Sequence, residues 1–208
     1  MSLVYEKKLP KGAYQIYLTE RPPFAFLEVN QVHGGELLLV EKADQGDSHH
    51  IVGTADGMVV LQEQFTQKPL GIKTADCLPV VVIGHKGVAA IHAGWRSVQQ
   101  KILAHPSLQL LDPYYAFIGP AIRPCCYEVG SEFKTYFPSD CLEERTGKIY
   151  FDLAKAAITQ LQEHYKLEVQ LCPLCTMCST APRLNSHRRD NLRLRNYNIY
   201  DYNCDLRS

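Results

Sequence analysis

Short runs of apolar, often β-branched residues dominate the first half of the chain, and polar turns separate them. The clearest pair covers 78–83 and 88–91, joined by a Gly-His-Lys-Gly turn. Two such runs around a glycine-bounded turn predict a β-hairpin. Further strands are expected at 24–29, 36–40, 58–61, 70–73, 114–118 and 169–171.

The second half of the chain adds helical patterns. Residues 153–165 carry apolar side chains at helical spacing, and Asp152 stands where a capping side chain is expected. Shorter helices are predicted at 97–104, with Ser97 as the cap, and at 131–136. Because a tight hairpin joins antiparallel strands, the sheet is not purely parallel. We therefore predict a single-domain α/β fold with mixed or antiparallel sheets.

A cysteine and a histidine lie near the open end of the predicted hairpin. If the turn is symmetric, Ile83 faces Val88. Counting back along the strands, Pro79 then faces His92, and Cys77 becomes a diagonal neighbour of His92. Such neighbours lie roughly 7–8 Å apart, within reach of a shared ion or a thiol–imidazole hydrogen bond. Both residue types suit zinc, and a catalytic zinc site uses three protein ligands with one position left open.

The third zinc ligand is expected at His33, in the Asn-Gln-Val-His-Gly segment that follows a predicted strand. Taken singly, Cys77 and His92 would be explained as a small buried residue and a core histidine. Both, however, stand at strand ends beside polar groups, Asp76 and Arg96. This setting favours a shared metal site.

Charged residues elsewhere are candidates for binding an anion. Arg96 stands at the start of the predicted helix, and Arg188 belongs to a Ser-His-Arg-Arg-Asp segment. The planar fork of arginine matches phosphate or carboxylate, although a solvated basic surface is the alternative. Asp56, at the start of a strand, is either a ligand-binding carboxylate or part of a structural turn.

Three later cysteines have the spacing of a partial metal site. Cys172, Cys175 and Cys178 resemble part of an iron–sulfur or structural zinc site. Such sites need four ligands, and the nearby candidates are Cys204 and His187. We favour reduced cysteines in a packed turn over a second metal.

Composition narrows the classes of function. Lys plus Arg and Asp plus Glu both number 22, so no overall charge favours nucleic acid or an anionic membrane as a partner. Residues 1–12 lack the apolar core of a signal peptide, and no apolar run approaches the length of a membrane span. We expect a soluble cytoplasmic protein whose eight cysteines are mostly reduced thiols or ligands.

Several short motifs together resemble one protein family. They are NQVHG at 30–34, TADCLPV at 74–80, AIHAGWR at 90–96, IGPAI at 118–122, CYEVG at 126–130, LCT at 174–176 and SHRRD at 186–190. In this order they are similar to the YfiH-type family, also called laccase-domain or multicopper polyphenol oxidase-like, whose members are assigned as purine nucleoside phosphorylases. The resemblance covers roughly 26–190, and we treat 1–208 as a single domain of this type.

The resemblance implies both a fold and an activity. The implied fold is a sandwich of two central sheets flanked by helices. The implied metal is zinc, bound by His33, Cys77 and His92. The implied reactions are phosphorolysis of adenosine, inosine and methylthioadenosine, with some adenosine deamination, and an older assignment is copper-dependent phenol oxidation.

Under the phosphorylase hypothesis, zinc polarises a substrate group or activates water, since a bound ion can lower the pKa of water to about 7. Arg96 and Arg188 hold phosphate against the ribose C1′, and Asp56 is a further candidate for substrate binding. The candidate catalytic residues are Asp76, Arg96 and His187. Asp76 or His187 orients a ligand or transfers a proton to the departing base.

The chain departs from the family pattern at four points. The family usually carries about thirty more residues before QVHG, including an Asn-Arg pair, whereas this sequence has only 1–30 there. Ser97 follows HAGWR where glycine is usual, His187 replaces a tyrosine, and Leu194-Arg195 replaces Gly-Arg. If the missing arginine helps to hold phosphate, the expected phosphorylase is slow, altered in specificity or inactive.

Two alternatives stay open. Cys77 as a thiolate nucleophile, with His92 as its base, would give a metal-free hydrolase or amidase. In the second alternative, the zinc is structural and the chain is a catalytically weak binding module. A copper oxidase is disfavoured because blue-copper sites add an axial sulfur ligand, and the methionines are confined to Met1, Met58 and Met177.

Overall fold

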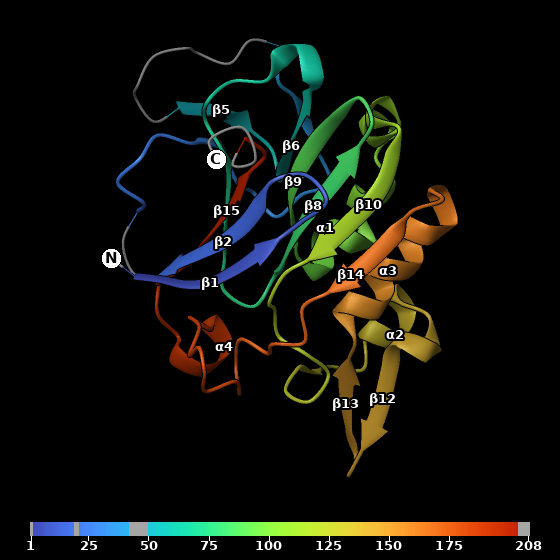
Figure 1. The fold of residues 1–208 in the computed structure, drawn as a ribbon. Helices are drawn as coiled ribbons and strands as arrows, with labels where there is room; N and C mark the ends of the chain where they lie inside the picture. Colours follow the sequence, from blue (N-terminus) through green and yellow to red (C-terminus); the bar gives the residue numbers. More distant parts are fainter. Residues whose placement is uncertain (1, 19–20, 42–49, 204–208) are drawn as a thin grey trace.

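Two long antiparallel strands form the centre of the protein, shown as a computed structural model in Figure 1. They are β8 (Leu78–Gly84) and β9 (Gly87–Ala93). Ile83 lies opposite Val88, and Pro79 lies opposite His92. The predicted hairpin and its register are therefore confirmed.

Two six-stranded sheets lie face to face around a shared core (Figure 1). The structure describes residues 2–18, 21–41 and 50–203. In spatial order, the first sheet contains β1 (Ser2–Lys8), β2 (Ala13–Leu18), β15 (Asn196–Asp201), β7 (Leu70–Thr74), β3 (Leu27–Asn30) and β5 (His50–Thr54). The second contains β14 (Glu168–Leu171), β10 (Pro113–Ile118), β8, β9, β6 (Gly57–Leu61) and β4 (Leu38–Leu39). Both sheets mix parallel and antiparallel pairs, so the predicted α/β sandwich is confirmed.

The central hairpin is buried on both of its faces. Along β8, Val81 and Ile83 belong to the core between the sheets, whereas Val80 and Val82 belong to the core on the other side. Successive side chains of a strand point to opposite faces, so an uninterrupted apolar run needs a cover on each face. This double burial explains why the hairpin was the strongest pattern in the sequence.

Helix α3 (Leu153–His164) supplies part of the cover on the outer face of the second sheet. Its limits agree with the predicted helix within one residue. Asp152 caps it as predicted, because its Oδ1 accepts a hydrogen bond from the backbone N–H of Lys155 at 2.9 Å.

The other helices are short. They are α1 (Trp95–Gln99), α2 (Phe133–Tyr136), α4 (His187–Asp190) and the 3-10 helices η1 (Gln62–Gln64), η2 (Ile102–Ala104), η3 (Pro106–Leu111) and η4 (Ser139–Cys141). The helix predicted at 97–104 is wrong in its limits and its cap, because α1 begins after Gly94. Lys101, with φ of 65°, interrupts the helical backbone before η2. Among the described residues, no helix combines the length and apolar character that a membrane crossing requires.

A third sheet has no counterpart in the sequence-based prediction. It contains β11 (Glu128–Val129), β13 (Lys148–Phe151) and β12 (Leu142–Arg145), and it projects beside α2 in Figure 1. Its strands are short and rich in charged residues, which hides the strand pattern. Phe151 anchors it, because this side chain is fully buried in the core on the helical side.

Candidate metal centre and adjoining cavities

Two imidazoles and one thiol converge at one end of the central hairpin. His33 lies in the loop after β3, Cys77 immediately precedes β8, and His92 is the penultimate residue of β9. One ligand atom from each of the three lies within 4.8 Å of the others. The two histidine rings meet edge to face, with centroids 4.8 Å apart. The group is therefore compact enough to share one ion.

A buried carboxylate behind these side chains holds both histidines. Asp56 is fully buried, and its Oδ1 accepts hydrogen bonds from the backbone N–H of His33 and from His92 Nδ1, each at 2.8 Å. Its Oδ2 accepts the backbone N–H of Gly34 at 2.5 Å. A carboxylate on Nδ1 fixes the ring orientation and leaves Nε2 for a ligand. Asp56 thus positions the group from behind and lines neither adjoining cavity.

The ionisation of these groups follows from their contacts. Burial disfavours the charged form of Asp56, but hydrogen bonds from His92, Gly34 and His33 hold the pKa of its carboxyl below the ordinary value. Burial likewise disfavours imidazolium at His92, yet the nearby Cys77 sulfur and Asp56 raise the pKa of His92 to about 9. Burial and the neighbouring His92 lower the pKa of His33, which favours the neutral imidazole that binds metals.

The backbone is strained at two of the candidate residues. His33 has φ of 62° and Asp76 has φ of 88°, both in the left-handed region that residues other than glycine rarely adopt. Such a conformation costs on the order of 1–3 kcal/mol and is found preferentially at functional sites. Gly94 meets a different requirement, since a Cβ at this residue would lie 3.1 Å from the Cys77 sulfur. A side chain at this position would require the thiol to shift by a few tenths of an ångström, so glycine suits the close approach.

Two cavities adjoin the histidine–cysteine group. His33, Cys77 and His187 line both of them. The first cavity is also lined by Asp76, Trp95, Arg96, Tyr127 and Arg188. The second has a volume of about 430 Å³ and is also lined by Lys73, His92 and Arg195. This volume lies in the range of roughly 300–1,000 Å³ that is typical of small-molecule sites.

Asp76 links the first cavity to α4. Its Oδ2 accepts the backbone N–H of Arg188 at 2.7 Å, and its Oδ1 accepts the hydroxyl of Thr176 at 2.6 Å. These bonds use both carboxylate oxygens and fix the beginning of α4 at the rim of the cavity. The side chain of Arg188 donates to the carbonyl of Glu128 at 2.8 Å and stays exposed.

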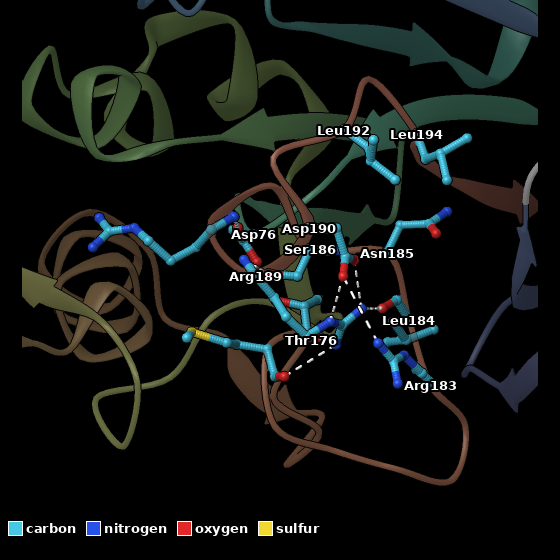
Figure 2. A network of polar contacts seen from close by, with 12 residues as sticks. Asp76, Thr176, Arg183, Leu184, Asn185, Ser186, Arg189, Asp190, Leu192 and Leu194 are labelled. Atoms are coloured by element: carbon cyan, nitrogen blue, oxygen red, sulfur yellow. Dashed lines mark hydrogen bonds and ion pairs between the residues drawn. The ribbon is translucent and has the colours of Figure 1, made fainter.

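The two adjacent arginines of α4 have different surroundings. Figure 2 shows Arg189 directed into a network within the protein, where its guanidinium pairs with Asp190 and donates to the carbonyls of Leu184 and Thr176. Arg188 instead lines the first cavity. Sequence spacing alone does not separate these two arginines, whereas their contacts do.

Six of the candidate residues line the first cavity, His92 lines the second, and Asp56 lies behind them. The sequence prediction did not include Trp95, Tyr127 and Thr176, although all three belong to the recognised motifs. An aromatic residue in a sequence is explained equally well as core, so only the three-dimensional arrangement identifies Trp95 and Tyr127 as cavity walls.

The second predicted cysteine group has a different membership from the one expected. Cys172 packs in the core between the sheets, His187 lines the cavities, and Cys204 lies outside the described residues. The sulfurs of Cys175 and Cys178 instead lie close to those of two cysteines from another loop. This cysteine cluster consists of Cys125, Cys126, Cys175 and Cys178.

A family model described as multi-copper polyphenol oxidoreductase laccase matches residues 16–195. The chain belongs to this family. Among laccase-family relatives, it is 40% identical over 130 residues to a protein of Aquifex aeolicus named purine nucleoside phosphorylase. This match covers 61% of this chain and 62% of the relative. It is 35% identical over 176 residues to a protein of Xylella fastidiosa with the same name, and this match covers 78% of this chain and 66% of the relative. The match thus spans less than two thirds of the length of either relative.

A solved structure supports the fold of this laccase-family chain. YlmD from Geobacillus stearothermophilus superposes with a TM-score of 0.73 over 96% of this chain and 99% of the YlmD chain. The sequence identity is 19%, so this likeness concerns the fold alone.

Proposed function

We propose that the protein is a zinc-dependent purine nucleoside phosphorylase, which converts adenosine, inosine or methylthioadenosine and phosphate to the free base and a pentose 1-phosphate. The observation that carries the proposal is the compact group of His33, Cys77 and His92. Two of its members, His33 and Cys77, line the first cavity together with Arg96 and Arg188. The names of the two relatives supply the reaction class.

The donor set fits zinc. Two imidazoles and one thiolate are three protein ligands, which leaves the fourth tetrahedral position for a substrate or water. The carboxylate of Asp56 on His92 Nδ1 is a common support for a zinc-bound histidine. Copper fits less well, because Met58 packs between the sheets and Met177 packs against the helical core instead of serving as an axial ligand. Zinc bound here would supply a Lewis acid at the boundary of both cavities.

The walls of the first cavity suit a purine and an anion. Trp95 and Tyr127 offer aromatic surfaces, and Trp95 is itself stacked on Tyr136 with an angle of 12° between the rings. Burial raises the pKa of Tyr127, so its hydroxyl stays protonated and can donate a hydrogen bond. Arg96 and Arg188 supply positive charge for phosphate on the same cavity.

In the proposed reaction, a phosphate oxygen forms a bond to the ribose C1′ while the bond from C1′ to the base nitrogen breaks. The electron pair of that bond leaves with the purine, which must then gain a proton. We assign this proton to His187, because its imidazole lines both cavities, whereas Asp76 is engaged by Thr176 and Arg188. Asp76 then holds Arg188 in position, and Asp56 positions the metal ligands instead of contacting substrate.

The test is incubation of the purified protein with adenosine and inorganic phosphate, followed by separation of the products. The proposal predicts adenine and ribose 1-phosphate in equal amounts, and no turnover when phosphate is omitted. Inosine as the sole product would indicate a deaminase. Absence of product at high enzyme concentration, with all three nucleosides, would leave a zinc-containing binding module as the better account.

A second candidate function is supported by one observation. The imidazole of His92 lies next to the Cys77 thiol, as the general base lies next to the nucleophile in many thiol hydrolases. Chelators and alkylating reagents separate the two candidates. A thiol hydrolase keeps its activity in a chelator and loses it on alkylation, whereas a zinc enzyme loses activity in the chelator.

A further inference from the structure

The cysteine cluster joins two loops that are distant in the sequence. Cys125 and Cys126 lie in a turn between β10 and β11, and Cys175 and Cys178 lie in the loop after β14. All four sulfur atoms are within 4.8 Å of one another. We propose that the cysteine cluster binds a single structural zinc ion, separate from the histidine–cysteine group at the cavities.

The sulfur positions fit one ion better than the alternatives. Zinc–sulfur bonds of about 2.3 Å in a tetrahedron set the sulfurs about 3.8 Å apart. The Cys125 and Cys178 sulfurs are 3.6 Å apart, whereas a disulfide bond would bring them to about 2.05 Å. A cubic iron–sulfur cluster attaches each cysteine to a different iron, which spreads the sulfurs further than a single ion does.

Groups around the cysteine cluster are arranged to support thiolate ligands. The backbone N–H groups of Arg123, Met177 and Cys178 lie beside the Cys175 sulfur. Two of these donors come from the Cys-x-x-Cys turn itself, so the loop already has a conformation that stabilises a metal-bound sulfur. Two ligands from such a turn and two from a second loop form a closed four-cysteine site.

A buried cation lies beside the cysteine cluster. Arg123 is only 8% exposed, and within the described residues its Nε and Nη1 atoms have no hydrogen-bond partner. Cys172, Cys175 and Cys125 are among the groups whose negative charge would act on this guanidinium. Zinc with four thiolates carries a net negative charge, and Arg123 would offset it in a partly buried setting.

The proposed ion would fix residues that line the first cavity. Thr176 follows Cys175 directly and donates its hydroxyl to Asp76, while Tyr127 follows Cys126 and forms part of the cavity wall. The backbone N–H of Thr176 also donates to the carbonyl of Ala121 at 3.1 Å, which ties the two loops together. The role of the second zinc is therefore structural, because four protein ligands leave no open position for a substrate.

The test uses the full chain with Cys77→Ala, in which the histidine–cysteine group loses its thiolate and the cysteine cluster remains. The protein is produced with zinc in the medium and purified without a chelator. Metal analysis should give about one zinc per chain, and zinc-edge X-ray absorption should give four sulfurs at about 2.3 Å. Replacing zinc with Co²⁺ should produce the intense visible absorption of a tetrahedral cobalt–thiolate site.

A second set of variants locates the ion. Adding Cys178→Ser, an exposed member of the cysteine cluster, to the Cys77→Ala chain should remove the zinc, whereas adding Cys141→Ala should leave it in place. If the Cys77→Ala chain contains no metal, contains iron, or has a mass two hydrogens lower because Cys125 and Cys178 have formed a disulfide, the proposal is wrong. A zinc spectrum dominated by nitrogen would also overturn it. None of these readouts depends on phosphorylase activity.

Discussion

The histidine–cysteine group and the cysteine cluster are alike in spacing but differ in what surrounds them. The first offers three donors of two kinds, and two cavities adjoin it. The second offers four sulfurs between two loops, close to the buried guanidinium of Arg123. Three ligands leave a coordination position for chemistry, and four close it. The number of donors and the neighbouring space are therefore the basis for the different roles that we propose for the two groups.

The largest effect is expected from removing a ligand of the histidine–cysteine group. Cys77→Ala should reduce phosphorolysis by about a thousandfold or more, because Lewis-acid stabilisation of a transition state is worth several kcal/mol. Initial rates with adenosine and phosphate measure the effect. Cys141→Ala, a buried cysteine outside both groups, serves as the control and should stay within about threefold of the wild type. Equal rates in both variants would show that the thiol takes no part in the reaction.

A smaller effect is expected from neutralising the Asp56 carboxylate behind the histidine–cysteine group. Asp56→Asn should weaken zinc binding at this site by about 10–100-fold, because the variant loses the charge that supports His92. Competition with a chromophoric chelator measures the dissociation constant, and Asp140→Asn, at an exposed carboxylate paired with Lys155, is the matched control. Unchanged zinc affinity in Asp56→Asn would mean that the negative charge of Asp56 does not support zinc binding by His92.

The neighbouring arginines of α4 provide a comparison within one helix. Arg188→Ala should raise the KM for phosphate by about tenfold or more, since a charge-assisted hydrogen bond contributes about 1.5–3 kcal/mol. Arg189→Ala should mainly lower Tm, because its guanidinium contacts carbonyls and Asp190 within the protein. Phosphate titrations and thermal unfolding of both variants check this. The reverse pattern, with Arg189 controlling the KM, would contradict the proposed phosphate site.

The smallest expected effect is on the acid stability of α4. The hydrogen bond from Arg189 lowers the pKa of Asp190 below its ordinary value of 3.8. A carboxyl with a lowered folded-state pKa stabilises the protein above its unfolded pKa, and this contribution is lost as the pH falls through the folded value. The difference in Tm between wild type and Asp190→Asn should therefore be present at neutral pH and shrink below about pH 4. A difference that stays constant into acid would exclude this ion pair as its cause.

The sequence was informative where one strong local pattern decides the structure. Val80 to Ile83 form an apolar run that only a doubly covered strand accommodates, and the turn geometry then brings His92 and Cys77 together. The cap at Asp152 is equally local. In these places the predicted elements and the candidate ligands could be read from residue order.

Features that depend on distant contacts could not be predicted in the same way. The charged strands of the third sheet become strands because Phe151 anchors them in the core. The cysteine cluster brings Cys126 beside Cys175, although three helices and four strands, from β11 to β14, separate them in the sequence. No local spacing reveals such a contact. The separate surroundings of Arg188 and Arg189 arise from the carbonyls that happen to face each side chain.

The most direct test of the proposed function is phosphorolysis of adenosine by protein freed of metal with a chelator, dialysed, and then supplied again with zinc. If the histidine–cysteine group holds a catalytic zinc, the metal-free protein should release almost no adenine, and added zinc should restore the rate of adenine release. Adenine release at an undiminished rate by protein shown to contain no metal would contradict the account.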